Sequence, residues 1–332
     1  MAVRIGINGF GRIGRYAVRL LADRQDLELV AVNARADNES LAHLLRYDSV
    51  HGQFSGQVEP NQEGFLLQGK QVKVTRQAPG EWKWGDLGVD LVLETTGSFR
   101  DMESNQKHLD CGARKVLISA PGKGVEATIV PGINDHHLKP EHSIISNASC
   151  TTNCMAPVVK ALHDRFSIER GIMTTVHSYT MDQRILDGSH KDLRRARAAA
   201  MSMIPTTTGA ARAVTEVIPE LKGKLDGMAI RVPTPNVSLV DLNLHMGEEV
   251  TADKVNAALK EASENELKDI LGYSEEPLVS VDYNGSRYGG VVDAPLTSLI
   301  EDRLLKVIAW YDNEAGFTHQ FIRLAQLTAR HL

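Results

Sequence analysis

The chain has 332 residues, which is enough for two domains of ordinary size and too many for one small core. With 42% hydrophobic and 24% charged residues, the composition is that of a globular protein without low-complexity stretches. Lys plus Arg number 37 and Asp plus Glu number 42, so the net charge of −5 gives no reason to expect binding to nucleic acid or to an acidic membrane surface.

The cysteines and the apolar runs indicate the compartment. Cys111, Cys150 and Cys154 are too few for a disulfide framework, which indicates a reducing compartment. A cysteine with a function is then more readily a reactive residue than a structural one. No apolar run approaches the roughly 20 residues of a membrane span. The N-terminal residues predict a buried strand rather than a signal peptide. We therefore expect a cytoplasmic protein.

The first half of the chain predicts a doubly wound α/β fold. An apolar segment from Val3 to Asn8 leads into a glycine turn, a helical pattern follows, and a second apolar run covers Leu27 to Asn33. This order is one βαβ unit. Further strands that suit a mostly parallel sheet are expected at Val72–Thr75, Leu91–Glu94, Lys115–Ile118 and His142–Ser146.

The second half predicts an α+β domain with a mostly antiparallel sheet. Long alternating segments occur at Gly171–Ser178, Asp226–Val232 and Ser238–Met246, with a helical pattern near Ala252–Asn265. A helix is expected from Cys150, made irregular by Pro157, and another from Phe317 to Leu332. We expect a dinucleotide-binding domain at residues 1–149 and 315–332, and a catalytic domain at residues 150–314.

The glycine turn favours a dinucleotide site. Gly9 allows the tight turn, Gly11 lets the backbone approach a pyrophosphate, and Gly14 permits close packing of helix on strand. The pyrophosphate would meet the free N–H groups of the helix N-terminus. A glycine turn without a ligand is the alternative.

The end of the second strand bears on the coenzyme. An Asp or Glu there usually binds the adenosine ribose, but this chain has Asn33-Ala34-Arg35. A missing carboxylate and an added cation would suit a 2′-phosphate. A solvent-exposed Arg35 beside an NAD site is the alternative.

Cys150 and His177 are the candidate catalytic pair. Asn147 and Ser149 are good helix-capping residues, which would place Cys150 in the first turn, where the helix dipole favours a thiolate. Cys154, four residues later, reads as a small packed residue. His177 ends an apolar strand, where its side chain can project into a cleft.

Several long motifs resemble one family, the glyceraldehyde-3-phosphate dehydrogenases. They cover residues 146–157, 177–183, 190–197, 205–211, 231–236 and 310–314, and the resemblance extends over essentially the whole chain. It implies that Cys150 forms a hemithioacetal and then a thioester with the aldehyde substrate. It also implies that His177 acts as the base, and that inorganic phosphate releases the acyl phosphate.

The resemblance further implies which residues bind anions and cofactor. Thr180, Asp182, Arg195 and Arg231 belong around the substrate phosphate, and Ser149, Thr151, Thr208 and Gly209 around the attacking phosphate. Arg195 could serve either site, and Arg194 reads as part of a solvated basic face. Cofactor residues are Gly9, Gly11, Arg12, Ile13, Gly14, Asn33, Ala34, Arg35, Gln77, Thr96, Ser119, Ser189 and Asn313, of which Asn313 would orient the nicotinamide carboxamide.

Within this family, Gly188-Ser189 is similar to the Ala-Ser of NADP-using members rather than to the Leu-Pro of NAD-specific ones. We therefore expect NADP or dual use, with an NAD-specific glycolytic form as the alternative. The loop from Ser178 to Met201 predicts a homotetramer in which a neighbour completes the cofactor site.

Other functions compete less well. His136, His137 and His142 lack the spacing and carboxylates of a metal site, so no metal is expected. An erythrose-4-phosphate dehydrogenase is disfavoured because that relative lacks the threonine found here at Thr180. A non-catalytic dinucleotide-binding protein is disfavoured by the intact Cys150 and His177.

Overall fold

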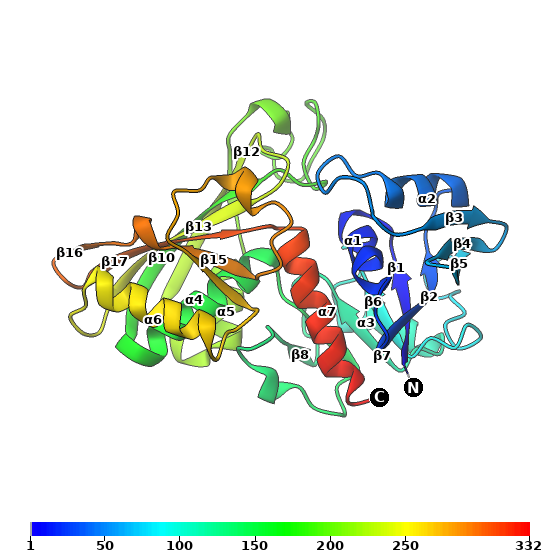
Figure 1. The fold of residues 1–332 in the computed structure, drawn as a ribbon, viewed down its shortest axis with the longest axis horizontal. Helices are drawn as coiled ribbons and strands as arrows, with labels where there is room; N and C mark the ends of the chain where they lie inside the picture. The colour runs from blue at the N-terminus through cyan, green and yellow to red at the C-terminus, as the bar shows by residue number, and fades with distance from the viewer. Residues whose placement is uncertain (1) are drawn as a thin grey trace. The chain divides into compact units, whose positions relative to one another are not determined.

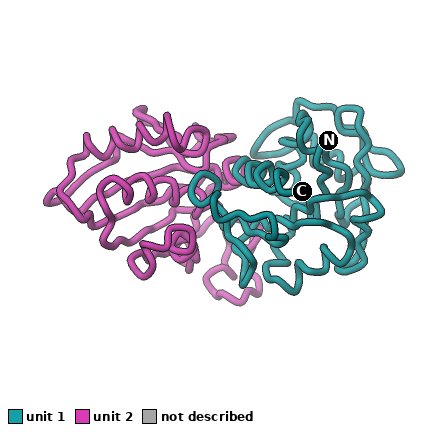
Figure 2. The backbone as a smooth tube through the Cα atoms, turned by 90° about the horizontal axis from the view of Figure 1, so that it is seen from below, with its two compact units in different colours: residues 1–148, 318–332 teal, residues 149–317 magenta. Residues whose placement is uncertain are grey.

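The computed structural model describes residues 2–332, shown as a ribbon in Figure 1. The chain forms two compact units, which Figure 2 colours separately. Unit 1 runs to Ala148 and takes up the chain again at Thr318–Leu332, and unit 2 is Ser149–Phe317. These boundaries differ from the expected ones by one residue (149 against 150) and by three residues (317 against 314).

Unit 1 contains a sheet with the order β3-β4-β5-β2-β1-β6-β7-β9-β8. The pairs β3/β4 and β4/β5 are antiparallel and the other pairs are parallel. The strands are β1 (Val3–Asn8), β2 (Leu27–Asn33), β3 (Val58–Asn61), β4 (Gly64–Leu67), β5 (Lys70–Thr75), β6 (Leu91–Glu94), β7 (Lys115–Ile118), β8 (Ala127–Thr128) and β9 (Ile144–Ser146). Chain order reverses between β1 and β6, which makes their carboxyl ends the switch point of a doubly wound fold and confirms the predicted fold class.

The sequence reading missed the hairpin of β3 and β4. Pro60 lies inside β3 and pairs with Phe65. A proline removes a backbone donor, and it is tolerated here because β3 lies at the edge of the sheet. An interior proline is therefore compatible with a strand that has only one neighbour.

The helices of unit 1 are α1 (Arg12–Leu21), α2 (Asn38–Arg46), α3 (Met102–Asp110) and most of α7 (Ala315–Ala329). The C-terminal helix α7 contributes Phe321 and Leu324 to a buried cluster with Ile5 and Leu91. Burial of these apolar side chains explains why the end of the chain returns to the first unit. A short 3₁₀ helix occupies Asp135–His137.

Unit 2 contains a second sheet, with the order β11-β12-β10-β13-β17-β15-β14 and with β16 paired to β17. The pairs β10/β12 and β14/β15 are parallel and the others antiparallel, so the expected mostly antiparallel sheet is confirmed. The strands are β10 (Ile168–Ser178), β11 (Ile204–Thr207), β12 (Leu225–Val232), β13 (Ser238–Met246), β14 (Leu271–Ser274), β15 (Gly290–Asp293), β16 (Ser298–Ile300) and β17 (Leu304–Tyr311).

The helices α4 (Cys150–Phe166), α5 (Ala210–Val217) and α6 (Ala252–Glu264) pack against this sheet. Helix α4 continues through Pro157 without a break. Its residues from Thr151 to Val159 are all buried, so tertiary packing outweighs the lost backbone hydrogen bond. Among residues 2–332, no helix combines the length and apolar character that a membrane-spanning segment needs.

Candidate active site

Cys150 is the first residue of α4, and Ser149 caps the helix. The Ser149 hydroxyl accepts a hydrogen bond from the Thr152 backbone N–H at 3.1 Å. Directly before it, Ala148 has a φ of 57°, a left-handed conformation that costs a non-glycine residue free energy. The sharp turn thus sets the thiol at the N-terminal end of the helix.

His177 lies near the carboxyl end of β10 and faces Cys150. Its Nε2 atom is 3.5 Å from the Cys150 Sγ, within hydrogen-bonding range for sulfur. Its Nδ1 atom is 2.6 Å from the Ser178 carbonyl oxygen, so we assign the imidazole proton to Nδ1. This tautomer leaves Nε2 as an acceptor for the thiol proton, as a general base requires.

Arg231 places a positive charge beside this pair. The parallel register of β10 and β12 sets Arg231 opposite His177. The Arg231 Nη1 atom lies 2.8 Å from His177 Nδ1 and 3.0 Å from the Ser178 oxygen. A protonated Nδ1 cannot accept a hydrogen bond, so only the contact with the Ser178 oxygen can be one. We therefore assign the Arg231 hydrogen bond to the Ser178 oxygen. Burial and the Arg231 charge lower the pKa of His177 to about 3.

The Cys150 thiol depends on His177 for its activation, because it is not already ionised in the folded protein. Burial raises the pKa of the Cys150 thiol, and the Arg231 charge and the hydrogen bonds at Thr151 offset this only in part. The expected preference for a thiolate at the helix start is therefore weakened by desolvation. With a neutral imidazole at 3.5 Å, the thiol can lose its proton to His177 as it attacks.

Tyr311, which the sequence analysis did not single out as a site residue, contacts the His177 ring and the residue after Cys150. Its hydroxyl lies 2.9 Å from the Thr151 hydroxyl and 2.8 Å from that of Thr175, and its ring meets His177 edge-on at 5.8 Å. Burial raises the pKa of Tyr311, so the phenol stays neutral. The one signal in the sequence was its place in the family motif at residues 310–314.

Arg195 forms a second basic group in unit 2. Its guanidinium pairs with Asp182 and donates to the Thr206 hydroxyl at 3.0 Å and to the Thr207 oxygen at 3.2 Å. Its charge also contributes to lowering the pKa of His177. Two arginines whose charges both act on His177 make a region suited to anionic substrates.

The other expected anion-binding residues have different surroundings. Thr208 accepts from the Ala210 N–H. Gly209 is the N-cap of α5 and supplies no side-chain cap, so later N–H groups of the first turn remain for an anion. The Thr180 backbone N–H donates to the Gln183 side-chain oxygen at 3.2 Å. Thr151, in contrast, is buried and bonded to Tyr311, and the Ser149 hydroxyl is engaged by Thr152.

The glycine turn in unit 1 has the form of a phosphate cradle. Gly9 has a φ of 101°, and a Cβ there would lie 2.9 Å from the Thr96 nitrogen. A Cβ on Gly14 would meet the Gly9 oxygen at 2.4 Å. Gly11 differs, because nothing lies within 4 Å of its would-be Cβ. The chain's own packing does not require that glycine, whereas a close ligand would, so the residues fit a dinucleotide pyrophosphate.

The remaining cofactor candidates of unit 1 follow the carboxyl ends of its strands. Thr96 follows β6 and Ser119 follows β7. Arg12 opens α1, and its guanidinium holds the Asp48 carboxylate in a two-point ion pair. Ile13 is half-buried next to it.

The loop after β2 is more basic than the sequence reading recognised. Ala34 is 8% exposed, whereas Arg35 is exposed and has no hydrogen bond or ion pair with residues 2–332. Arg76, which directly follows β5, donates to the Ala36 oxygen at 2.7 Å. The side chain of Asn33 bonds to the backbone of Gln77. The position of Arg76 after a strand was the available signal.

Ser189 and Asn313 belong to unit 2. Ser189 is exposed, and its carbonyl accepts from Arg184 at 3.0 Å. Asn313 is buried, and its side chain accepts a hydrogen bond from Ser238. Within the described part of the chain, no three His, Cys, Asp or Glu side chains are placed to hold a metal ion.

Known proteins match the chain along its length. Residues 3–102 match the NAD binding domain of glyceraldehyde 3-phosphate dehydrogenase, and residues 149–313 match its C-terminal domain. The chain is 57% identical to a glyceraldehyde-3-phosphate dehydrogenase of Geobacillus stearothermophilus over 331 residues, with 99% of each chain covered. It is 55% identical to glyceraldehyde-3-phosphate dehydrogenase 1 of Bacillus subtilis (99% of each covered) and 54% identical to the Thermotoga maritima enzyme (98% of each). The chain belongs to the glyceraldehyde-3-phosphate dehydrogenase family.

Proposed function

We propose that the chain oxidises and phosphorylates D-glyceraldehyde 3-phosphate to 1,3-bisphosphoglycerate, reversibly, with a nicotinamide dinucleotide as coenzyme. The observation that carries this proposal is the Cys150–His177 pair, with Sγ and Nε2 3.5 Å apart beside Arg231. A thiol, a neutral base and a fixed cation are the groups that acyl transfer from a phosphorylated aldehyde requires.

Each residue of the pair has a defined task. Cys150 Sγ bonds to the aldehyde carbon, while its proton passes through His177 Nε2 to the carbonyl oxygen, which gives the hemithioacetal. The bound nicotinamide supplies the acceptor for the hydride. His177 takes the hydroxyl proton as the thioester forms. Inorganic phosphate then attacks the thioester carbon, and Cys150 leaves and recovers a proton.

An assay of aldehyde-dependent coenzyme reduction tests this proposal. Activity with glyceraldehyde 3-phosphate should depend on inorganic phosphate for sustained turnover. Faster turnover of erythrose 4-phosphate would favour the related dehydrogenase instead. Coenzyme binding without reduction by either aldehyde would favour a non-catalytic dinucleotide-binding protein.

For the coenzyme, we propose NADP or dual use. Ala34 stands where a ribose-binding acid is expected, Arg35 has no partner within residues 2–332, and Arg76 adds a second guanidinium at the same loop. By the family resemblance, the loop with Ser189 would reach the cofactor of a neighbouring copy and add a hydroxyl there. Two guanidinium groups at one loop favour a 2′-phosphate over a bare hydroxyl. Measurement of kcat/KM for NAD and NADP side by side tests this.

For the assembly, we propose a homotetramer. The loop after β10 exposes large apolar side chains, which are 74–86% exposed at Met181, Ile185, Leu186, Leu193, Met201 and Met203. Several large apolar side chains exposed on one loop favour an interaction site there. Coverage by a second copy of the chain would remove them from water.

A further inference from the structure

Glu94 is a buried carboxylate that the catalytic chemistry does not use. It ends β6, and its side chain is 0% exposed. One oxygen, Oε1, accepts from the backbone N–H of Thr96 at 2.7 Å and from the Thr96 hydroxyl. The other, Oε2, accepts from Asn8 Nδ2 at 2.6 Å and faces His108 Nε2 at 3.2 Å. Four donors thus surround the carboxylate.

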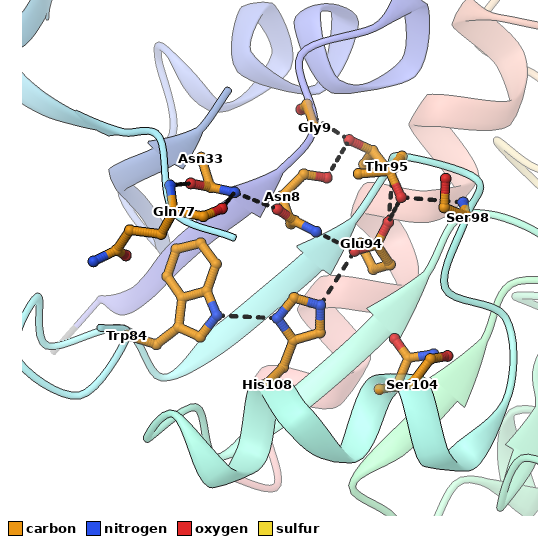
Figure 3. Close-up of polar contacts among 12 residues, drawn as sticks. Asn8, Gly9, Asn33, Gln77, Trp84, Glu94, Thr95, Ser98, Ser104 and His108 are labelled. Carbon is orange, nitrogen blue, oxygen red and sulfur yellow. Dashed lines mark hydrogen bonds and ion pairs between the residues drawn. The ribbon is translucent and has the colours of Figure 1, made fainter. Parts of the chain in front are cut away.

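His108 on α3 completes one side of this arrangement (Figure 3). Its Nδ1 atom accepts from the Trp84 indole N–H at 3.0 Å, so the imidazole proton lies on Nε2 and is donated to Glu94. The ring stacks on Trp82 with centroids 3.9 Å apart and is 0% exposed. The imidazole cannot turn over without opposing one N–H to another.

Asn8 carries the connection to the neighbouring strand β2. Its Oδ1 atom accepts from Asn33 Nδ2 at 2.9 Å. Asn33 in turn donates to the Gln77 oxygen at 3.2 Å and accepts from the Gln77 N–H at 2.9 Å and the Thr75 hydroxyl at 2.9 Å. All hydrogen-bonding positions of the Asn33 amide are thus occupied by protein groups.

These hydrogen bonds lie at the carboxyl ends of neighbouring strands of the unit 1 sheet. Asn8, Asn33, Thr75 and Glu94 end β1, β2, β5 and β6, and the carboxyl ends of β1 and β6 are where such folds bind a dinucleotide. The Thr96 nitrogen that Glu94 holds is also the atom closest to the would-be Cβ of Gly9. Glu94 therefore fixes the segment against which the glycine turn packs.

We propose that Glu94, held by His108, is a positioning residue for the dinucleotide. The Glu94 relay, which we define as His108, Glu94, Asn8, Asn33 and Gln77, fixes the ends of the strands and the backbone that faces the coenzyme. In this arrangement Asn33 acts by orienting Gln77 rather than by touching the ribose with its side chain. The inference rests on the proposed use of a nicotinamide dinucleotide.

The Glu94→Gln variant tests the relay with little change in shape. Its amide NH₂ must face either Thr96 or the Asn8–His108 pair, all of which are donors. Loss of a charge-assisted buried bond predicts a rise in the KM and Kd of the coenzyme by about tenfold to a hundredfold. The KM of glyceraldehyde 3-phosphate and the rate of Cys150 alkylation, which report on unit 2, should stay within about twofold.

Asn134→Ala is the matched control. Asn134 is a buried amide of unit 1 whose side chain bonds to Thr128 and Val130, outside the relay. It should lower thermal stability without raising the coenzyme KM. An equal rise in coenzyme KM in both variants would assign the effect to general destabilisation and overturn the proposal.

Two further variants keep the test decisive if Glu94→Gln folds poorly. Adding Asn8→Asp to Glu94→Gln exchanges donor and acceptor across the same contact, so part of the coenzyme affinity should return. His108→Phe keeps the stacking on Trp82 and should raise the coenzyme KM severalfold while shifting the Trp84 indole N–H resonance. Unchanged coenzyme affinity in the folded variants would overturn the relay alone. An unmodified protein that binds neither NAD nor NADP would overturn the proposed function with it.

Discussion

The Ser238 hydroxyl donates a hydrogen bond to Oδ1 of Asn313 at 2.9 Å, while it accepts one from the Ser178 backbone N–H at 3.0 Å. Because its single proton goes to Asn313, the hydroxyl fixes which end of the Asn313 amide is turned toward β13. The Asn313 NH₂ group is then turned away from Ser238 as a donor. A carboxamide oxygen such as that of nicotinamide is a suitable acceptor for it.

Replacing Ser238 with Ala should therefore weaken coenzyme use. Asn313 would lose the bond that orients its amide, and a neutral buried hydrogen bond is worth about 0.5–1.5 kcal/mol, or roughly two- to tenfold in affinity. Steady-state kinetics should show a higher coenzyme KM. The Ser263→Ala variant, which removes a hydroxyl that donates to the Lys260 backbone oxygen, is the control. Equal kinetics for both variants would contradict this role.

Alkylation should identify Cys150 as the reactive cysteine. Cys154 is fully buried and its pKa is raised well above the usual value, and burial also raises the pKa of Cys111. Cys150 alone has a base at 3.5 Å. Iodoacetamide should label Cys150 first and abolish activity, and His177→Asn should slow the labelling. Peptide mapping that finds Cys111 or Cys154 labelled first, with activity kept, would refute the assignment.

The buried His177 should make the protein sensitive to acid. Its pKa is about 3 in the folded protein against 6.5 for the free side chain. Between these values the unfolded chain binds a proton that the folded protein does not. The free energy of unfolding should therefore fall as pH falls from about 6.5 to 3, by up to about 1.4 kcal/mol per pH unit.

The His177→Asn variant removes this contribution. Urea unfolding at pH 6.5 and 4.5 should show a loss of stability smaller by roughly 2–3 kcal/mol than in the unmodified protein. The exposed His43, replaced with Asn in the same way, serves as the control. An unchanged pH slope in His177→Asn would mean that His177 does not stay neutral in the folded state.

Restoring an acid at position 34 should shift coenzyme preference. The Ala34→Asp carboxylate would repel a 2′-phosphate and bind the ribose hydroxyls, so NADP use should fall by about ten- to a hundredfold and NAD use should improve. Ala34→Asn, which adds a similar volume without charge, controls for the limited space at this 8% exposed position. The double change Arg35→Leu with Ser189→Pro should also lower NADP use. A preference of the unmodified enzyme for NAD by more than about tenfold would contradict NADP use.

Disrupting the apolar loop should break the tetramer. Ile185 is 84% exposed, and Ile185→Glu would place a charge within the proposed contact. Light scattering at micromolar concentration should show a smaller species with reduced activity. Ile300→Glu, at a 64% exposed position outside the loop, should keep the tetramer. A monomer with full activity in the unmodified protein would contradict the assembly.

Local patterns in the sequence were sufficient for several parts of this protein. The βαβ unit followed from an apolar run, a glycine turn and helical spacing, all within the first 33 residues. The place of Cys150 followed from its neighbour Ser149, because a helix cap acts over three residues. Such features depend on near neighbours, so the sequence alone determines them.

Tertiary structure decided the contacts between distant segments. Tyr311 meets Thr151 although 160 residues separate them, and the register of β10 and β12 sets Arg231 opposite His177. The same holds for Glu94 and Asn8, which are 86 residues apart. Burial, too, depends on the whole fold, which is why the helix start by itself overstated the acidity of Cys150. Hydrogen bonds and desolvation between strands depend on sheet register, which no local pattern specifies.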